Sequence, residues 1–207
     1  MVYPIAKKTL FPLIRLFLKE VKGTENIPKK GPYIITANHE SYSDPFLICS
    51  VIIPLINKKI HFLAVKGRFW NLWGDKIARD WAGGVCLDYG KEKAFQELLN
   101  FLKKGEIVGI FTSLKSLDGK LQKGKTGIVR LALKARVPII PMGLIDAFDI
   151  APGDKLIPNL RRAKLHIGEP IYLDKYYGKD LNEKLLRKLT DDLMGIISKL
   201  TGKPYNY

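Results

Sequence analysis

The sequence predicts a single α/β domain in which a mostly parallel or mixed central sheet is flanked by helices. Short apolar and β-branched runs alternate with longer amphipathic segments along the chain, a pattern typical of this class. The length of 207 residues corresponds to one large domain, and no low-complexity tract or internal repeat divides it. Hydrophobic residues make up 46% and charged residues 27%, which are ordinary proportions for a folded globular protein.

The N-terminal part, residues 1–22, is predicted to form an amphipathic, membrane-associating helical segment ahead of a main domain at residues 23–207. Large apolar residues between Ile5 and Leu18 are interrupted by lysine and arginine. The segment therefore matches neither an uninterrupted membrane span of about 20 apolar residues nor a signal peptide. Its basic flanks favour a helix lying in the membrane interface, and packing on the domain's own core is the open alternative.

The strands of the predicted sheet are short apolar runs bounded by glycine, proline or polar residues. They are expected at residues 32–35, 59–65, 83–88, 107–111, 137–144 and 163–171, the last including a turn. Predicted helices occupy residues 46–56, 91–103, 127–134 and 181–200. Gly105 ends the second of these helices, and Pro54 is expected to end the first.

An aromatic and basic cluster follows the second predicted strand. Its members are Arg68, Phe69, Trp70, Trp73, Lys76, Arg79 and Trp81. Tryptophan favours positions where one side of the ring is wet and the other apolar, so the cluster is a candidate membrane-contact surface or acyl-chain entrance. Ordinary aromatic packing is the alternative interpretation.

A histidine and an aspartate share the loop after the first predicted strand. His39 precedes Asp44, and Asp44-Pro45 begins an apolar run, which is typical of a helix N-cap followed by a first-turn proline. Histidine has an unperturbed pKa close to neutral pH, so its ring can take a proton from an attacking alcohol and return it to a leaving group. Asp44 could hold the ring in one tautomer. The alternative is a capping aspartate beside an exposed loop histidine.

The chain is strongly basic, with 35 Lys and Arg residues against 20 Asp and Glu and a net charge of +15. Such a surface attracts polyanions. Anionic phospholipid headgroups are favoured over nucleic acid, because the sequence shows no zinc-ligand spacing, RNA-binding signature or helix-turn-helix pattern. We therefore expect a peripheral protein at the cytoplasmic face of an anionic membrane.

Some residues with reactive side chains are predicted to be structural. Cys49 and Cys86 lie far apart in apolar surroundings and are interpreted as small core residues of a cytosolic protein. His61 lies in a predicted strand without a metal-type neighbour at a recognisable spacing, and His166 has no visible catalytic partner.

Asn38-His39, four intervening residues and Asp44 resemble the first signature of the glycerolipid acyltransferase family, whose best-known members acylate lysophosphatidic acid. The resemblance extends from about residue 23 to residue 171. Lys66 and the strand at 83–88 are similar to the second signature, although Tyr89 stands where the family usually has arginine. The closing signatures resemble Val137-Pro138-Ile139-Ile140-Pro141 and Gly168-Glu169-Pro170-Ile171.

The chain departs from the family at the third signature. The family pattern Phe-Pro-Glu-Gly-Thr-Arg-Ser holds the phosphate of the acceptor, whereas this chain has Phe111-Thr112-Ser113-Leu114-Lys115-Ser116-Leu117. The downstream Asp118-Gly119 and lysine-rich glycine segment match. Lysine replaces the charge of arginine but not its two-pronged geometry, so the identity of the acceptor stays open. The candidate substrate-binding residues are Lys66, Thr112, Ser113, Lys115, Ser116, Lys123 and Lys125. For the loop residues, a solvated basic loop is the alternative.

The resemblance implies a membrane-surface O-acyltransferase of phospholipid biosynthesis. Such an enzyme moves a fatty acyl group from acyl-CoA or acyl carrier protein to a hydroxyl of a lysophospholipid or glycerol-phosphate-like acceptor, as in 1-acylglycerol-3-phosphate acylation. His39 would be the base and Asp44 its orienting partner, with no metal or bound cofactor. Two alternatives stay open: an acyltransferase with a non-phosphate acceptor, and a catalytically silent domain that binds membranes or acyl chains.

Overall fold

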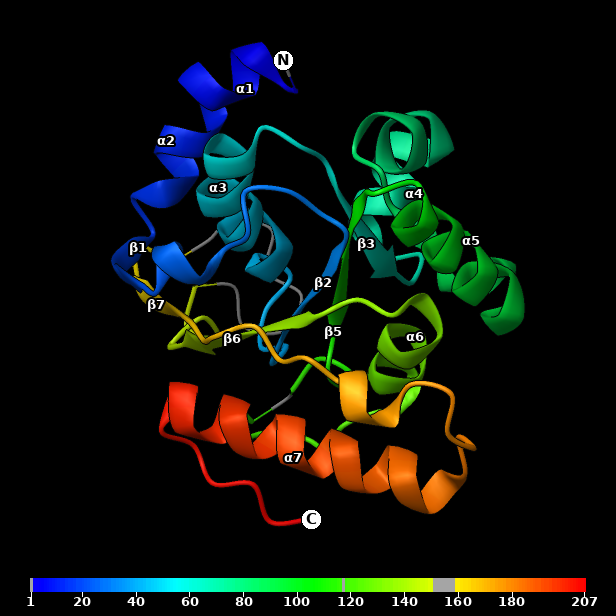
Figure 1. Ribbon diagram of the computed structural model, residues 1–207. Helices are drawn as coiled ribbons and strands as arrows, with labels where there is room; N and C mark the ends of the chain where they lie inside the picture. The colour runs from blue at the N-terminus through cyan, green and yellow to red at the C-terminus, as the bar shows by residue number, and fades with distance from the viewer. Residues whose placement is uncertain (1, 117, 151–158) are drawn as a thin grey trace.

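The computed structural model describes residues 2–116, 118–150 and 159–207. In this part of the chain, seven strands form one sheet in the order β1-β7-β6-β2-β5-β3-β4 (Figure 1). The strands are β1 (Leu18–Lys22), β2 (Tyr33–Ala37), β3 (Ile60–Ala64), β4 (Val85–Cys86), β5 (Ile107–Phe111), β6 (Ile139–Ile145) and β7 (Ala163–Ile167). The strands from β6 to β4 are parallel, β7 is antiparallel to β6, and β1 is parallel to β7. The predicted α/β class with a mixed sheet is confirmed.

Helices cover both faces of the sheet (Figure 1). One face carries α1 (Pro4–Lys8), α2 (Leu10–Arg15) and α3 (Asp44–Ile56), and the other carries α5 (Lys91–Lys103), α6 (Gly127–Ala135) and α7 (Glu183–Thr201). Residues of β2 alternate between the two cores: Tyr33 and Ile35 pack toward the first group of helices and Ile34 toward the second. Every residue of β2 is buried, which explains its continuous apolar sequence.

The best-predicted elements are α5 and β5, whose bounds are those expected from the sequence. Gly105, between them, has a φ of 78°. This left-handed conformation is accessible to glycine with little strain and ends the helix. The short segments are η1 (Thr24–Asn26), η3 (Leu87–Tyr89) and η4 (Asp174–Tyr176), all 3-10 helices.

The N-terminal segment differs from the predicted helical segment of residues 1–22. The helix is divided at Thr9 into α1 and α2, and the chain then forms β1, an edge strand paired with β7. Residues 18–22 are therefore part of the central sheet and not of a helix. The two helices use one side for packing, where Ala6 and Phe11 are buried. Other apolar residues of this segment are 45–77% exposed, namely Ile5, Leu10, Leu13 and Leu16, the last being the C-cap residue of α2.

None of the described helices has the length and apolar composition needed to cross a membrane. Element boundaries also differ from the prediction elsewhere. The strand expected at 83–88 is reduced to β4, because Leu87 begins η3. Helix α3 begins at Asp44 and contains Pro54 instead of ending there.

The aromatic and basic cluster folds into α4 (Arg68–Asp75) and the π-helix η2 (Lys76–Trp81). Trp70 is buried beside Ala78 and Cys86, so aromatic packing is the interpretation that holds for this residue. Trp81 is 52% exposed, and its ring centroid lies 4.8 Å from that of Tyr3. The side chains of Arg68, Phe69 and Trp73 lie outside the described part of the structure.

Candidate active site

The site forms where the parallel strands end. The carboxyl ends of β2, β3, β5 and β6 lie along one edge of the sheet, the edge at which open α/β sheets place their ligands. His39 follows β2, Lys66 follows β3 and Thr112 follows β5. The sheet thus brings residues from distant parts of the sequence to the same edge.

His39 and Asp44 form a hydrogen-bonded pair. Asp44 Oδ2 lies 2.8 Å from His39 Nδ1 and also accepts the backbone N–H groups of Glu40 at 2.7 Å and Ser41 at 2.8 Å. The Asp44 side chain is fully buried, and these contacts fix its position. The predicted helix cap is wrong, because Ser43 occupies the N-cap position and Asp44 directs its hydrogen bonds to the loop. The predicted proline in the first turn is confirmed.

The His39 ring is held against the end of β5. Its centroid lies 4.1 Å from that of Phe111, with 13° between the two planes. The side chain is 19% exposed. Because Asp44 engages Nδ1, the other ring nitrogen, Nε2, is the one placed to meet a substrate. This arrangement can exchange a proton at Nε2 while the carboxylate stabilises the protonated ring.

Residues 38–43, between β2 and α3, form the His39 loop. Asn38 anchors this loop to β6. Its side-chain N–H donates to the carbonyl of Leu144 at 2.8 Å, and its side-chain oxygen accepts the Leu144 N–H at 2.8 Å. The amide thereby continues the pairing of the two strands beyond the last residue of β2. The family signature contains this asparagine, but its two hydrogen bonds to Leu144 had no signal in the sequence.

Glu40 is a buried carboxylate of the same loop that no sequence pattern marked as part of the site. It is 2% exposed, and its side chain accepts hydrogen bonds from Asn38 at 2.9 Å and from the ammonium group of Lys203. Burial raises the pKa of Glu40, while Lys203 acts in the opposite direction. Lys203 lies 163 positions along the chain from Glu40, so no local sequence signal could have indicated the pair.

Residues 112–116 and 118–125, the described parts of the loop that contains the altered third signature, lie against the His39 loop. The backbone N–H of Ser116 donates to the carbonyl of His39 at 2.8 Å. Thr112 and Ser116 are buried, and their hydroxyls donate to the carbonyl of Ala37 at 3.2 Å and to Asp118 at 3.0 Å. These hydroxyls therefore shape the loop.

The structure brings one predicted lysine close to the His39 loop. Lys115 Nζ lies 3.7 Å from the ring centroid of Tyr42, which is half-exposed. Ser113 lies two residues earlier and donates its hydroxyl to the carbonyl of Leu114 at 3.0 Å. Lys115 is thus the candidate binding residue that the geometry favours most.

The other predicted lysines are placed differently. Lys66 Nζ lies 4.5 Å from the ring centroid of Tyr89, and its hydrogen bond with the Tyr89 hydroxyl raises the pKa of Lys66. Lys123 and Lys125 are exposed further along the loop. Their predicted role in binding stays a prediction.

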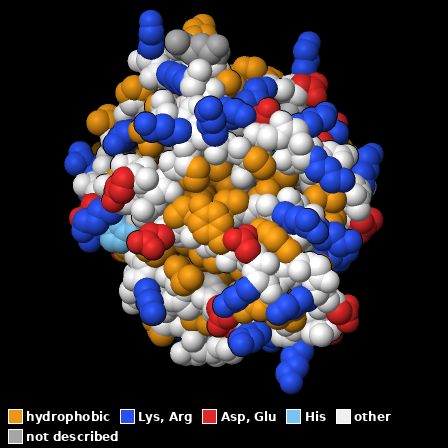
Figure 2. Space-filling view, in the orientation of Figure 1, with side chains coloured by type: hydrophobic (Ala, Val, Ile, Leu, Met, Phe, Trp, Pro, Cys, Tyr) orange, Lys and Arg blue, Asp and Glu red, His pale blue; other side chains and the backbone are white. Residues whose placement is uncertain are grey.

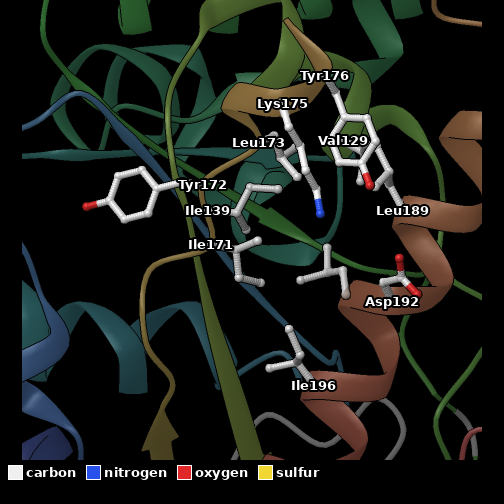
Figure 3. A pocket seen from close by; sticks show the side chains of 11 residues that line it. Val129, Ile139, Ile171, Tyr172, Leu173, Lys175, Tyr176, Leu189, Asp192 and Ile196 are labelled. Atoms are coloured by element: carbon white, nitrogen blue, oxygen red, sulfur yellow. The ribbon is translucent and has the colours of Figure 1, made fainter.

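The structure contains a mainly apolar cavity of about 150 Å³ (Figure 3). Its lining includes Ile139, the first residue of β6, together with side chains from α6 and α7. Because β6 and β2 are parallel, Ile139 marks the edge of the sheet opposite to His39. This cavity is therefore separate from the candidate site.

The remaining histidines make contacts outside the candidate site, and His166 has a carboxylate partner that the sequence did not indicate. His61 is 8% exposed, stacks on Phe101 and has Nδ1 3.1 Å from the carbonyl of Gly83. His166 connects β1 and α7, with Nε2 2.7 Å from Glu20 and Nδ1 2.9 Å from the carbonyl of Leu200. Both cysteines are free thiols.

The class of protein follows from a comparison with known families, which agrees with the fold and with the residues at this edge of the sheet. A sequence profile described as "Acyltransferase" matches residues 19–145, more than half of the chain. The chain therefore belongs to the acyltransferase family, and the predicted enzyme class, an O-acyltransferase, is confirmed.

The relatives that the chain matches include acyltransferases of glycerolipids, the group that its motifs resemble. The 1-acyl-sn-glycerol-3-phosphate acyltransferase of Bacillus subtilis (strain 168) is 28% identical over 187 residues, which cover 89% of this chain and 88% of that protein. The chloroplastic 1-acyl-sn-glycerol-3-phosphate acyltransferase BAT2 of Brassica napus is 27% identical over 169 residues, covering 75% of this chain and 46% of that protein. This chain thus spans about half the length of the plant relative.

A solved structure shares the fold. The 1-acyl-sn-glycerophosphate (LPA) acyltransferase PlsC from Thermotoga maritima matches with a TM-score of 0.69 and 24% sequence identity, covering 98% of this chain and 83% of that chain. The agreement extends over nearly all of the present fold, including the regions outside residues 19–145.

Proposed function

We propose that this enzyme transfers a fatty acyl group from a thioester donor to a hydroxyl of a lysophospholipid or glycerol-phosphate-like acceptor, as in 1-acylglycerol-3-phosphate acylation. The observation that carries the proposal is the 2.8 Å contact between His39 Nδ1 and Asp44 Oδ2 at the carboxyl edge of the sheet. The relative from B. subtilis supports the acceptor class, because that protein is named for 1-acyl-sn-glycerol-3-phosphate.

In the proposed reaction, His39 Nε2 takes the proton of the acceptor hydroxyl as its oxygen attacks the thioester carbonyl carbon. Asp44 stabilises the protonated ring through Nδ1. The new C–O bond gives a tetrahedral intermediate, whose oxyanion would be stabilised by backbone or basic side-chain donors at the sheet edge. The C–S bond then breaks, and His39 returns the proton to the leaving thiolate. The steps use no covalent acyl-enzyme, metal or bound cofactor.

The position of Lys115 supports an anionic group on the acceptor. Its ammonium group lies in the loop whose Ser116 N–H contacts the carbonyl of His39, and it packs on the ring of Tyr42. A lysine can attract phosphate as a point charge, without the directional pairing that arginine provides. We therefore propose that Lys115 contributes to acceptor binding. The proposed donor is acyl-CoA or acyl carrier protein.

The same loop favours a second candidate, an acyltransferase with a non-phosphate acceptor. The hydroxyls of Thr112 and Ser116 already donate to Ala37 and Asp118. The loop also contains no arginine between residues 112 and 125. Fewer groups are therefore placed to recognise a phosphate than the family signature would supply.

A matrix of donors and acceptors tests both candidates. Palmitoyl-CoA and palmitoyl acyl carrier protein would each be assayed against lysophosphatidic acid, glycerol 3-phosphate, lysophosphatidylcholine and a long-chain alcohol, with thiol release and acylated product both measured. We expect transfer to a phosphate-bearing acceptor, with little thiol release in its absence. A preference for the alcohol would favour the second candidate. Thiol release without acylated product from any acceptor would contradict acyl transfer.

We further propose that the protein works peripherally at the cytoplasmic face of an anionic membrane and contacts it through α1 and α2. The exposed apolar residues on these helices lie near Lys7, Lys8 and Arg15. Figure 2 shows basic side chains bordering hydrophobic ones on one face of the molecule, including the upper left, where α1 and α2 lie in Figure 1. Apolar insertion and attraction to anionic headgroups would act together on such a surface.

Replacing both Leu13 and Leu16 by aspartate is expected to weaken binding to phosphatidylcholine–phosphatidylglycerol vesicles at least about tenfold. Each leucine is 61% exposed, and burying such a side chain in the bilayer contributes about 1.5–3 kcal/mol. Vesicle sedimentation would measure the change. The matched control is Leu160→Asp, at a leucine that is 95% exposed elsewhere. Equal loss of binding in the control would contradict a specific role for α2.

A further inference from the structure

Lys203 connects two loops of the candidate site, although it lies in the C-terminal tail. Its ammonium group contacts the buried carboxylate of Glu40 and donates to the carbonyl of Gly119 at 2.6 Å. The first contact is in the His39 loop and the second is in the loop of residues 112–125. The Lys203 side chain is 24% exposed, so most of it is enclosed between these partners.

The contacts of Lys203 complete a ring of hydrogen-bonded residues that includes His39 and Asp44. The Glu40 backbone N–H donates to Asp44 at 2.7 Å, and Asp44 holds His39. From the other side, the Ser116 N–H donates to the His39 carbonyl, and the Ser116 hydroxyl donates to Asp118, the neighbour of Gly119. A break at Lys203 therefore leaves the two loops joined at fewer points.

A cavity of about 500 Å³ lies beside this connection. One wall is formed by residues 118–122 and the other by the tail, including Lys203 and Tyr207. The hydrogen bond from Lys203 to the carbonyl of Gly119 joins the two walls.

We propose that Lys203 is a positioning residue. It fixes the position of the proposed acceptor-binding loop, residues 112–116 and 118–125, relative to His39 and Asp44. This inference rests on the proposed function for its kinetic consequence, but the physical connection can be tested without activity. Small displacements of a bound reactant cost rate, because the reacting atoms must lie close together and aligned. Loss of the connection should therefore weaken productive binding of the acceptor more than that of the donor.

The test must separate this connection from the buried charge pair. Lys203→Met alone leaves the Glu40 carboxylate buried without its cation, which is expected to destabilise the fold. We therefore compare Lys203→Met/Glu40→Gln with Glu40→Gln, two variants that share a neutral residue at position 40 and differ in the connection to Gly119. Lys203→Arg tests rescue, and Lys199→Met removes an exposed lysine near the end of α7 as the matched control.

We expect the acceptor KM of Lys203→Met/Glu40→Gln to be about tenfold above that of Glu40→Gln, with the donor KM within about twofold. Lys203→Arg should keep the acceptor KM within about threefold of the parent, and Lys199→Met should leave both KM values unchanged. An equal acceptor KM in the two compared variants overturns the proposal. So does a fall in kcat alone that matches the loss of folded protein, because a purely structural role predicts that result.

Amide hydrogen exchange gives a readout that requires no turnover. The Ser116 amide is bonded to the His39 carbonyl, and the Lys120 amide to Asp118. Both should exchange about tenfold faster in Lys203→Met/Glu40→Gln than in Glu40→Gln, while the core amide of Ile110 stays unchanged. Unchanged exchange at Ser116 and Lys120 overturns the proposal even in an active enzyme. If the parent transfers no acyl group, the proposed function fails and exchange still decides whether Lys203 connects the loops.

Discussion

Replacing His39 by alanine is expected to lower the rate of acyl transfer about a thousandfold while the protein stays folded. General base catalysis by a positioned side chain contributes about 10²–10⁴-fold, and the alanine variant retains no group that can accept a proton at the position of Nε2. The ring is only 19% exposed, stacks on Phe111 and contacts the buried Asp44, so its loss also removes buried contact, and rates are compared per folded molecule. Initial rates with the preferred donor and acceptor would measure the effect, alongside thermal unfolding.

The matched control for this change is His166→Gln. The two imidazole side chains have nearly equal exposure, 19% for His39 and 20% for His166, but His166 contacts Glu20 and the Leu200 carbonyl away from the site. We expect the control to keep activity within about threefold. Added imidazole should partly restore the His39→Ala variant, since a small base can occupy the vacated space. A His39→Ala rate near that of the parent would exclude His39 as the base.

Local sequence signals were sufficient where a segment's structure is decided by its own residues. The central strand β5 is a continuous apolar run that begins just after the glycine ending α5, and both elements have their predicted bounds. The His39 and Asp44 pair was equally accessible, because the two residues are five positions apart in one loop. The spacing alone suggested a helix cap as well, and the hydrogen bonds from Glu40 and Ser41 distinguish the two interpretations.

The structural features that the sequence did not reveal depend on contacts between residues far apart in the chain. In β1, Lys19, Glu20 and Lys22 give no apolar strand signal, and the segment becomes a strand because its backbone pairs with β7. Edge strands commonly contain such charges, which oppose pairing with other molecules. The contact between Glu40 and Lys203 depends in the same way on where α7 delivers the C-terminal tail. Neither contact has a local pattern that could predict it.

Asp44→Asn is expected to lower activity by up to about 10⁴-fold, the loss seen when the orienting aspartate of a catalytic triad becomes asparagine. The amide is nearly isosteric and can still place an oxygen where Oδ2 accepts the Glu40 and Ser41 N–H groups. It carries no negative charge, so the protonated His39 ring loses the partner that stabilises it during the reaction. The measurement is kcat at saturating acceptor, since the change removes an interaction that strengthens as the proton is transferred.

Stability must be followed in the same experiment, because Asp44 is fully buried and its Oδ1 has no hydrogen-bond partner within the described residues. An asparagine N–H group at the Oδ1 position would be an unsatisfied donor, which costs about 1–3 kcal/mol in the free energy of unfolding. Rates are therefore compared per folded molecule. Asp180→Asn, at an exposed aspartate, controls for the loss of one negative charge and should retain full activity. If Asp44→Asn kept its kcat within about threefold of the parent, Asp44 would be a structural anchor of the loop, and His39 would act without its help.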